Sequence, residues 1–587
     1  MAGKKNVRKI YIGVAWPYVN DIFHIGNLAG AYLPPDIFAR FHKLRGNRVL
    51  MVSGSDFHGT PITLRAEKER KKPEEIATQF HRLDKEYLKK FDIDYTLYTS
   101  THTQNHQHVV QEMFLQLLKK KFIQIKKTEQ LYSEQSKKFL QDRYIEGQCP
   151  YCNAPDARGD QCEKCGRTLD ALELINPISK TDKSNLTRKE TENYFLDLTK
   201  LQKDVKKWLL PQTSMRAWVK SEALGWIREG LKPRSITRDI DYGVPLPIEK
   251  IPKSQRIENI TRKKFYVWFE AVVGYLSAAV EYSQKIKKPN YWREFFYNPK
   301  GETYYFVGQD NLVFHCINWP AQLIAYDKKI NLPTNVFVNK FLLLEGKKMS
   351  KSRGWFIETP YLVGQYPIDA VRFYVAFNMP EQKEFNFTWK EFIETNNSIL
   401  VGTIGNYIHR VAVLAQKNFG SKFYLTPKSV ALEVKTRIEK AFEKTENHLN
   451  KGEFRSALQA IVDLASFGNA YVDRNQVWKM VKEDPRKAKI VVLAALSLAN
   501  ALGVLLYPFV PESSDRFNYL FGYKKWSSYI REGKDFWHFL SHKGKIELPR
   551  HITPVFPKIE ETNISKETAS LLKLEVNKHR SLLFPRK

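Results

Sequence analysis

The chain has 587 residues, 43% of them hydrophobic and 13% aromatic, which suffices for about four domains with buried cores and excludes an intrinsically disordered protein. Five cysteines in this length exclude a disulfide framework and indicate a reducing compartment. The net charge of +31 favours a polyanionic partner such as a nucleic acid, although a basic proteome or a thermophilic surface would give the same balance.

The start of the chain is basic and is followed by a short apolar run. Met1 to Lys9 carries the positive charge, and the apolar run from Ile10 to Trp16 is interrupted by Gly13. A secretory signal needs a longer apolar core, so we expect no export and a cytoplasmic location.

A strand-helix-strand unit comes first in the chain. Ile10 to Ala15 is predicted as a strand, the residues from near His24 to Arg45 as a helix, and Val49 to Val52 as a second strand. The turn-rich stretch from Ser53 to Pro61 lies at the carboxyl end of that strand, where open α/β sheets place their ligands. The unit therefore predicts a parallel sheet.

The sheet is predicted to be split by an insertion. Helical stretches run to about Phe122, a cysteine cluster then interrupts them, and strands return at Lys264 to Trp268 and Tyr304 to Val307. A further strand, Val336 to Leu344, leads into a basic loop at Lys348. The residues between about 123 and 250 are therefore expected to lie between two halves of one sheet.

The last third of the chain is predicted to be helical. Long amphipathic stretches predict a helix bundle and span residues 391–417, 428–447, 454–480 and 487–507. After the bundle, a segment with Pro549, Pro554 and Pro557 is expected to run as an extended strap, followed by a helix from about Ser565 to His579.

One stretch of this bundle is apolar enough to need a membrane test. Ile490 to Val510 has no charged residue and is long enough to span a bilayer. Ser497, Asn500 and Gly503 fall three apart along it and Pro508 lies within it, which fits a close-packed bundle helix. We therefore expect no membrane partner.

His24 and Asn27 lie three residues apart at a predicted helix start. Both face the same way at the positive end of the helix dipole, beside backbone N–H groups without helical partners. This arrangement suits phosphate binding. The alternative is that His24 is a structural capping residue.

A cationic loop follows the last predicted strand. Between Gly346 and Gly354 the chain has Lys347, Lys348, Lys351 and Arg353 and no carboxylate. A mobile cationic loop with glycine ends suits the charge that develops on a pyrophosphate leaving group. The alternative is an ordinary solvated basic loop.

Together these two stretches resemble the two signatures of class I aminoacyl-tRNA synthetases, and the resemblance covers nearly the whole chain. They read His24-Ile25-Gly26-Asn27 and Lys348-Met349-Ser350-Lys351-Ser352. Within that class the chain resembles the methionyl-tRNA synthetase family. The motifs that carry this closer likeness are Ala15-Trp16-Pro17-Tyr18, Asp56-Phe57-His58-Gly59-Thr60-Pro61, Phe265-Tyr266-Val267-Trp268, Gly308-Gln309-Asp310 and Phe314-His315.

The resemblance implies a ligase reaction in two steps. The methionine carboxylate attacks the α-phosphorus of ATP, bound with Mg²⁺, and gives methionyl-adenylate and pyrophosphate. Methionine then passes to the 3′ terminal adenosine of tRNA(Met), both elongator and initiator. No appended dimerisation domain follows the strap, so we expect a monomer.

The implied fold is an α/β, Rossmann-like parallel-sheet catalytic domain, split by a zinc-knuckle insertion and followed by an α-helical bundle that binds the anticodon. The expected parts are the first half of the catalytic domain at 1–122, the connective insertion at 123–250, the second half at 251–345, the KMSKS loop and stem-contact region at 346–388, the anticodon-binding domain at 389–547, and the strap and helix at 548–587.

The family also implies roles for single residues. Asp56 is expected to accept the α-ammonium of methionine as a charge-assisted hydrogen bond. The ATP-binding residues implied are His24, Asn27, Gly308, Asp310, Lys348 and Lys351, of which His24, Asn27, Lys348 and Lys351 are also catalytic. The methionine-binding residues implied, besides Asp56, are Trp16, Tyr18, Trp268, Ala271, Val272, Tyr275, Phe314 and His315, with aromatic rings that suit a thioether.

The chain departs from the family pattern at four positions. Asn27 stands where a second histidine is usual, and an amide donates a hydrogen bond but carries no charge. Asp21, Gln309 and Val272 stand where glycine, lysine and proline are common. The nucleotide contacts near Asn27 and Gln309 are the ones most affected.

The cysteine cluster is a strong metal signal. Two CxxC pairs separated by nine residues can present four thiolates to one tetrahedral zinc ion, with redox cysteines as the alternative. Four sulfurs leave no open position for water, so we expect one structural Zn²⁺ in a knuckle that supports the tRNA acceptor end. Its ligands are Cys149, Cys152, Cys162 and Cys165.

Three residues of the bundle resemble the family's anticodon readers. Asn406 and Arg410 are one helical turn apart, and Trp478 follows on another helix. A tryptophan can stack on an unpaired base while Asn and Arg bind base edges and phosphate. The alternative is ordinary bundle packing and a solvated face.

Two other functions remain open from the residues. The first alternative is another class I synthetase, for leucine, isoleucine, valine or cysteine. The three branched-chain enzymes have a large hydrolytic insertion, whereas here that space is short and holds the cysteine cluster. The cysteine enzyme needs zinc in its amino-acid pocket, and this sequence offers no thiolate near Asp56 or Trp268. A non-catalytic, zinc-stabilised RNA-binding protein is the second alternative. Asn27 keeps it open, and the presence of both Lys348 and Lys351 argues against it.

Overall fold

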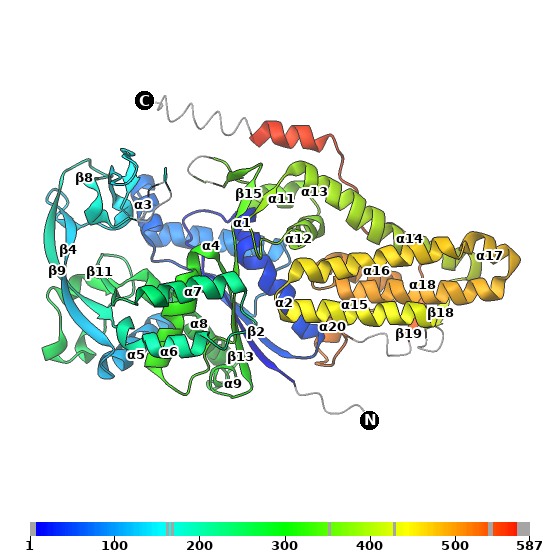
Figure 1. Cartoon of the computed structure of the whole chain (residues 1–587), viewed down its shortest axis with the longest axis horizontal. Coiled ribbons are helices and arrows are strands. Elements are labelled where there is room, and N and C mark those ends of the chain that lie inside the picture. The colour runs from blue at the N-terminus through cyan, green and yellow to red at the C-terminus, as the bar shows by residue number, and fades with distance from the viewer. Residues whose placement is uncertain are drawn as a thin grey trace.

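The structure is a computed structural model that describes residues 7–159, 162, 164–165, 169–349, 351, 354–425, 430–537 and 544–571. Figure 1 shows a mixed α/β half, which contains the sheet, and an elongated helical half, which contains α14 to α18. The predicted fold class, a split parallel sheet followed by a helical region, is confirmed.

Five parallel strands form the central sheet, in the order β14-β13-β1-β2-β3. β1 (Lys9–Val14) pairs with β2 (Arg48–Ser55) on one side and with β13 (Gly301–Gly308) on the other. The edge strands are β3 (Leu97–Ser100) and β14 (Asn335–Asn339). β1 is buried from its second residue onward, as expected for a parallel strand that is covered on both faces.

The helix predicted from His24 contains a π-helical turn. α1 (Ile25–Asn27) continues through the π segment η1 (Leu28–Tyr32) into α2 (Leu33–Leu44). Pro34 and Pro35 in the first turn of α2 have no N–H group to donate to the preceding turn. The N–H of Leu33 accordingly bonds to the carbonyl of Leu28, five residues back.

Helices cover both faces of the sheet. α2 packs with Ile10, Ile12 and Val14 on one face. On the other face, Tyr11, Leu50 and Val52 pack with α5 (Gln104–Lys119), α8 (Val267–Lys285), α9 (Arg293–Phe296) and α10 (Trp319–Tyr326). α3 (Thr60–Glu69) and α4 (Pro73–Lys90) follow β2 in the chain.

The described residues of the insertion include two small sheets and two α-helices. Its backbone is a long antiparallel pair, β4 (Ile123–Ser133) and β9 (Leu186–Leu196), flanked by β5 (Lys138–Phe139) and β10 (Arg234–Ser235). β6 (Ile145–Gln148), β7 (Ala157–Arg158) and β8 (Ile175–Ser179) form the second sheet, and the helices are α6 (Leu198–Leu209) and α7 (Ala217–Glu229).

Two predicted strands have the wrong extent. The first is the strand predicted at Lys264 to Trp268, of which only the start is extended. β12 spans Lys263–Phe265 and pairs with β11 (Thr237–Asp239). α8 already begins at Val267. Short apolar runs do not distinguish a strand from the first turn of a buried helix.

The stretch from Val336 to Leu344 is likewise not one strand. It breaks after Asn339, and β15 (Leu342–Leu344) leaves the central sheet to pair with β16 (Lys347–Lys348) and β17 (Phe385–Phe387). After this small sheet come α11 (Thr359–Gln365) and α12 (Ile368–Phe377).

The helical half begins at α13 (Trp389–Thr395), which runs through the π segment η9 (Asn396–Gly405) into α14 (Asn406–Phe419). The stretch predicted as one helix at 454–480 is two helices, because Gln476 has a left-handed φ of 43°. The other helices are α15 (Leu432–Asn450), α16 (Phe454–Arg474), α17 (Val477–Glu483), α18 (Pro485–Leu506), α19 (Pro511–Leu520) and α20 (Trp526–Ile530), with a hairpin of β18 (Lys422–Leu425) and β19 (Gly544–Glu547).

Two helical stretches in the described part of the chain are long and apolar enough to cross a membrane. They are Trp389–Phe419 and Pro485–Leu506, with 44% and 83% of their apolar windows buried inside the protein. The second contains most of the segment tested above, and its burial by neighbouring helices agrees with the predicted bundle helix.

A buried ion pair fixes the helical half to the sheet. Arg372 of α12 is fully buried and donates to Asp36 of α2 at 2.7 Å and to the carbonyl of Phe509 at 2.9 Å. Because α2 continues the helix that begins beside His24, the same contacts hold that helix in place.

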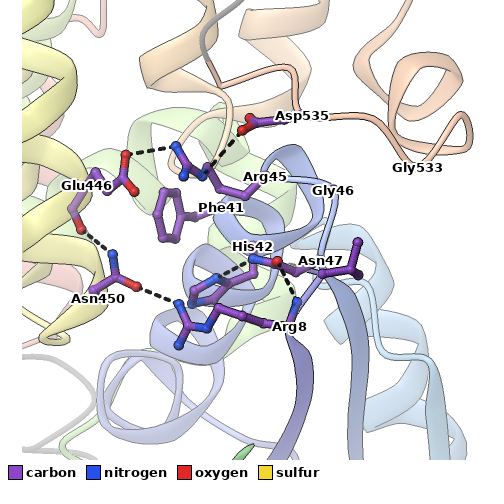
Figure 2. A pocket seen from close by; sticks show the side chains of 11 residues that line it. Arg8, Phe41, His42, Arg45, Gly46, Asn47, Glu446, Asn450, Gly533 and Asp535 are labelled. Atoms are coloured by element: carbon purple, nitrogen blue, oxygen red, sulfur yellow. Dashed lines mark hydrogen bonds and ion pairs between the residues drawn. The ribbon is translucent and has the colours of Figure 1, made fainter. Parts of the chain in front are cut away.

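A second contact between the two halves surrounds a cavity of about 240 Å³, shown in Figure 2. Arg45, just after α2, pairs with Glu446 of α15 at 2.9 Å, and Arg8 donates to Asn450 at 3.1 Å. Arg8 precedes β1 and Asn47 precedes β2, so the cavity lies at the amino ends of the strands, opposite the edge where ligands were predicted.

The predicted strap follows β19 and returns toward the sheet. Ile559 and Asn397 of η9 exchange hydrogen bonds of 3.0 and 2.8 Å. The final helix is described from Asn563 to Leu571. Its buried Glu567 accepts hydrogen bonds from Tyr361 of α11 at 2.6 Å and from Tyr366, just after α11, at 2.8 Å. The predicted end of that helix, His579, lies outside the described residues.

Candidate functional site

The segment that contains His24 caps its own helix. His24 is the N-cap of α1, and its Nδ1 accepts a hydrogen bond from the Gly26 N–H at 3.1 Å. The Asn27 Oδ1 accepts from the His24 N–H at 3.1 Å, which completes a capping box. Both side chains are therefore held in defined rotamers. The expected alternative, in which His24 is a structural capping residue, is correct for its Nδ1 atom.

These contacts also define the state of the two polar groups. Burial and the neighbouring Lys351 charge lower the pKa of His24 to about 3, so the ring is neutral at physiological pH. Because Nδ1 is an acceptor, the ring proton is assigned to Nε2. Asn27 uses its carbonyl oxygen in the cap and keeps its amide hydrogens as donors.

The basic loop and the first helix meet in space, although more than 300 residues separate them. The Ile25 N–H donates to the Ile357 carbonyl at 3.2 Å, and His24 pairs with Glu358 in an antiparallel bridge. The Thr359 hydroxyl donates to the Phe23 carbonyl at 2.9 Å. The two predicted ATP-binding stretches are therefore parts of one site at the carboxyl end of β1.

Lys351 reaches this site from the loop. Its ammonium donates to the Ile22 carbonyl at 2.5 Å and lies 3.9 Å from the Asp21 carboxylate. Gly346 and Gly354, which bound the loop, have φ angles of +80° and +72°, a conformation that glycine adopts without strain. Ser350, Ser352 and Arg353 lie outside the described residues.

Lys348 is placed differently from Lys351. It belongs to β16 and is exposed, and its ammonium lies 5.6 Å from the centre of the Phe341 ring. The structure thus brings Lys351, and not Lys348, into contact with the His24 segment.

Asp56 lies at the carboxyl end of β2, beside Tyr18. The two residues pair in an isolated parallel bridge beyond the end of the β1–β2 pairing, and Asp56 accepts the His58 N–H at 3.1 Å. Burial and the nearby Glu270 charge raise the pKa of the Asp56 carboxyl well above its ordinary value. A buried carboxylate of this kind is stabilised when a cation binds to it.

A buried polar network beside Asp56 was not predicted from the sequence. The Glu270 carboxylate is fully buried in α8 and lies 2.9 Å from His58 Nδ1 and 2.6 Å from His106 Nε2. His106 Nδ1 lies 2.9 Å from the Ser277 hydroxyl. The available signal was a single acidic residue inside the apolar run that follows Trp268.

The predicted aromatic residues form two groups. Trp268 stacks on Phe314 with ring centres 4.0 Å apart, and Tyr18 meets Trp268 edge-on at 5.9 Å. Ala271 and Val272 are buried on the same helix as Trp268. The structure therefore brings these aromatic side chains together from three separate segments.

The second group surrounds Tyr275. Its hydroxyl lies 2.6 Å from His315 Nε2, and the other ring nitrogen of His315 lies 2.8 Å from the Asn311 carbonyl. Burial lowers the pKa of His315 to about 4, so the ring is neutral, donates from Nδ1, and accepts from Tyr275. The result is an uncharged, polarisable wall.

Trp16 packs edge-on against Tyr275, with ring centres 6.5 Å apart. Its indole ring lies against two glycines. A Cβ at Gly54 would lie 2.4 Å from the Trp16 ring, and one at Gly274 would lie 2.9 Å from it. Both positions therefore require glycine to admit this ring.

Gly308 and Asp310 lie at the carboxyl end of β13, next to β1. Gly308 ends the strand, and Gln309–Asn311 forms a 3₁₀ turn in which the Asp310 carboxylate accepts from the Asn311 amide at 3.2 Å. A Cβ on Gly308 would lie 2.9 Å from that carboxylate oxygen. The turn thus reaches the same edge of the sheet as His24 and Asp56.

The four predicted cysteines form one cluster, with their sulfur atoms all within 4.8 Å of one another. Two of the separations are 3.6 Å, between Cys152 and Cys162, and 3.9 Å, between Cys149 and Cys165. Four thiolates at about 2.3 Å around a tetrahedral zinc ion would lie about 3.8 Å apart. The cluster therefore fits a closed metal site.

The cluster lies between strands of the insertion, and the insertion contacts helix α3 close to it in the chain. The Cys149 N–H donates to the Ala154 carbonyl at 2.8 Å, which closes the first CxxC turn. The Tyr144 hydroxyl, just before β6, lies 2.8 Å from Thr63 of α3, the helix that follows the Asp56 loop.

The three bundle residues lie near the far end of the helical half. Arg410 of α14 pairs with Asp473 at 2.5 Å, and its guanidinium lies 5.3 Å from the centre of the Trp478 ring. Trp478 is 43% exposed, and Asn406, one turn before Arg410, is also exposed. An exposed tryptophan beside an arginine can stack on a base, so simple core packing is excluded for Trp478.

Comparison with known proteins adds independent findings. The family model "tRNA synthetases class I (M)" matches residues 10–412, and "Anticodon binding domain of methionyl tRNA ligase" matches residues 426–570. A methionine–tRNA ligase of Thermomicrobium roseum is 38% identical over 96% of this chain and 99% of its own length. One from Roseiflexus sp. strain RS-1 is 42% identical over 88% of this chain and 87% of its own.

A solved structure agrees at the level of the fold. Mycobacterium tuberculosis methionyl-tRNA synthetase bound by methionyl-adenylate superposes with a TM-score of 0.73 over 94% of this chain and 100% of its own. The sequence identity is 19%.

Proposed function

Because this chain belongs to the class I methionyl-tRNA synthetase family, we propose roles for its residues in that family's reaction. The activity is that of a methionine–tRNA ligase, which forms methionyl-adenylate from methionine and ATP and transfers methionine to tRNA(Met). The observation that carries the residue roles is the contact between the His24 segment and the loop that contains Lys351.

The triphosphate of ATP binds where these two stretches meet. Neutral His24 donates its Nε2–H and Asn27 its amide hydrogens to phosphate oxygens at the positive end of α1, and Gly308 and Asp310 meet the ribose. Lys351 moves from the Ile22 carbonyl to the phosphate oxygens, where its charge stabilises the in-line transition state. Lys348 contributes a further positive charge from the exposed side of the loop. Mg²⁺ arrives with ATP.

Methionine binds between the carboxyl ends of β1 and β2 and helix α8. Asp56 accepts the α-ammonium, while the walls around Trp268 and Tyr275 hold the thioether. The neutral Tyr275–His315 pair has no charge that would favour a charged side chain over the thioether. The remaining pocket residues are Trp16, Tyr18, Ala271, Val272 and Phe314.

The insertion and the bundle contact tRNA. One Zn²⁺ held by the four cysteines keeps the knuckle folded and takes no part in the chemistry, since all four positions are thiolates. Trp478 stacks on an anticodon base, and Asn406 and Arg410 bind base edges and phosphate. The net charge of +31 supports the attraction to the RNA backbone.

The six segments 1–122, 123–250, 251–345, 346–388, 389–547 and 548–587 are the proposed domains, in a cytoplasmic monomer. The experiment that tests the proposed function is pyrophosphate exchange into ATP, measured with each of the twenty amino acids in turn. Only methionine is expected to support exchange. Exchange with another amino acid and none with methionine would overturn the assignment.

A further inference from the structure

The buried network around Glu270 has no role in the mechanism above, yet it touches the group proposed to bind the α-ammonium. Glu270 projects from the first turn of α8, next to residues of the methionine pocket, and has no exposed surface. Burying a carboxylate costs several kcal/mol unless it is paired. A buried carboxylate of this kind therefore suggests a role, either in positioning a neighbouring group by hydrogen bonds or in placing a negative charge beside it.

The carboxylate is paired on both sides by rings from different segments. His58, in the loop after β2, lies at 2.9 Å from one oxygen, and His106 of α5 lies at 2.6 Å from the other. His106 is itself backed by Ser277, two helical turns further along α8 than Glu270. The network therefore ties α5, α8 and the Asp56 loop together.

His58 links this network to the substrate group. Its side chain is held by Glu270, and its backbone N–H donates to the Asp56 carboxylate at 3.1 Å. The Thr101 hydroxyl accepts the Phe57 N–H at 3.0 Å and lies 3.4 Å from His58 Nδ1, which fixes the same loop from β3. The direction in which Asp56 points is thus set through His58.

We propose that Glu270 is a positioning residue for recognition of the α-ammonium group, acting through His58 to orient Asp56 and adding a second buried negative charge beside it. This inference rests on the proposed function. It adds a residue and a charge to the recognition of the amino group, which has so far been assigned to Asp56 alone.

The two carboxylates make ammonium binding depend on pH in a defined way. Burial and the Glu270 charge raise the pKa of Asp56, so this carboxyl keeps its proton to a higher pH than an ordinary aspartate does. Proton and ammonium then compete for one carboxylate. The other titratable groups that face this pair are His58, His102, His106, Tyr18 and Tyr242.

Replacement of Glu270 by Gln tests the charge while it keeps the shape. In alkaline solution, where both carboxylates are ionised, E270Q is expected to raise the KM for methionine about tenfold with kcat nearly unchanged. As the pH is lowered the ratio of the two KM values is expected to shrink, because without the Glu270 charge the pKa of Asp56 is lower and a smaller share of Asp56 is protonated in the variant than in the wild type. A purely structural defect would give one ratio at every pH.

Two inhibitors separate the ammonium from the rest of the ligand. Methioninol keeps the ammonium and lacks the carboxylate, whereas 4-(methylthio)butanoate lacks the ammonium. E270Q is expected to raise the inhibition constant of methioninol and to leave that of 4-(methylthio)butanoate within about twofold. Equal losses for both inhibitors, or a pH-independent KM ratio, would overturn the proposal.

Glu281 supplies the matched control on the same helix. It lies near the other end of α8, where it accepts from Thr99 at 2.7 Å and pairs with Lys285 at 2.6 Å. E281Q is expected to leave both inhibition constants unchanged. Methionine-dependent pyrophosphate exchange by the wild type is measured alongside. Its absence would show that the proposed function has failed, which is a different result from failure of the role of Glu270.

A measurement on the wild type keeps the inference testable if E270Q does not fold. Methioninol binding is followed by calorimetry in two buffers of different ionisation enthalpy. Binding is expected to release more protons near pH 6 than near pH 8.5, because the proton that Asp56 holds is displaced by the ammonium. Equal proton release at the two pH values would overturn the proposal.

Discussion

The Ile25 N–H donates to the carbonyl of Ile357 across 3.2 Å, and this hydrogen bond joins the first helix of the chain to the segment that follows the cationic loop. It places His24 and Lys351 in one site, because each lies within a few residues of this bond. The predictions below start from that contact.

Lys351→Ala is expected to slow adenylate formation about 100-fold, since a cation is lost where negative charge develops in the transition state. The Kd for methionine is expected to remain unchanged, because the lysine donates to the Ile22 carbonyl and lies beside Asp21, and neither is a proposed residue of the methionine pocket. Single-turnover formation of adenylate and calorimetric binding of methionine measure the two quantities.

Lys348→Ala is the comparison for that variant. Lys348 is exposed and lies over the Phe341 ring, so its removal is expected to have a smaller effect than that of Lys351. Equal adenylate rates in wild type and Lys351→Ala would refute the role of Lys351.

Any fall in the rate of adenylate formation between pH 8 and pH 5.5, the acid limb of the pH profile, is expected to be independent of His24. The pKa of His24 is lowered to about 3, below its ordinary value near 6.5, so lowering the pH from 8 to 5.5 leaves this ring neutral. His24→Asn should therefore be slower than wild type with a parallel pH profile of adenylate formation. An acid limb present in the wild type and absent from His24→Asn would show that the ring titrates in this range.

Purified protein is expected to contain one zinc ion per chain. The sulfur separations of 3.6 and 3.9 Å match a tetrahedral thiolate site, and such ions contribute directly to folding. Cys162→Ser should lower the zinc content and the melting temperature. Denatured wild-type protein that releases no zinc, and no cadmium after reconstitution, would exclude the assignment.

Trp478→Ala is expected to weaken aminoacylation of tRNA(Met) by about 10- to 100-fold, because stacking on a base is worth about 1–3 kcal/mol. Pyrophosphate exchange should be unchanged, since Trp478 lies in the helical half, away from His24. Trp226 of α7 is 42% exposed against 43% for Trp478 and gives a matched control. The opposite pattern, with exchange lost and aminoacylation kept, would contradict the proposed role.

The parts of the fold that could be predicted are those with a local signal. The apolar strand at Ile10, the CxxC pairs and the helical periodicity after Trp389 all depend on residues close in sequence. The sequence predicted that Tyr304 to Val307 returns to the same sheet but did not predict its pairing with β1, because nothing local links residues so far apart.

The parts that were missed depend on tertiary contacts. The break after Asn339 and the π turn at Leu28 follow from which sheet a short strand joins and from two prolines in the next turn. Glu270 could be seen as a lone acid in an apolar helix, but its partners His58 and His106 come from distant segments and have no spacing that identifies them.

The most direct test of the central claim is a crystal structure of the protein with methionine and a non-hydrolysable ATP analogue. The account predicts one nucleotide whose phosphates lie within hydrogen-bonding distance of both His24 and Lys351, with the α-ammonium of methionine on Asp56. A nucleotide bound elsewhere, or one that contacts only one of the two stretches, would contradict it.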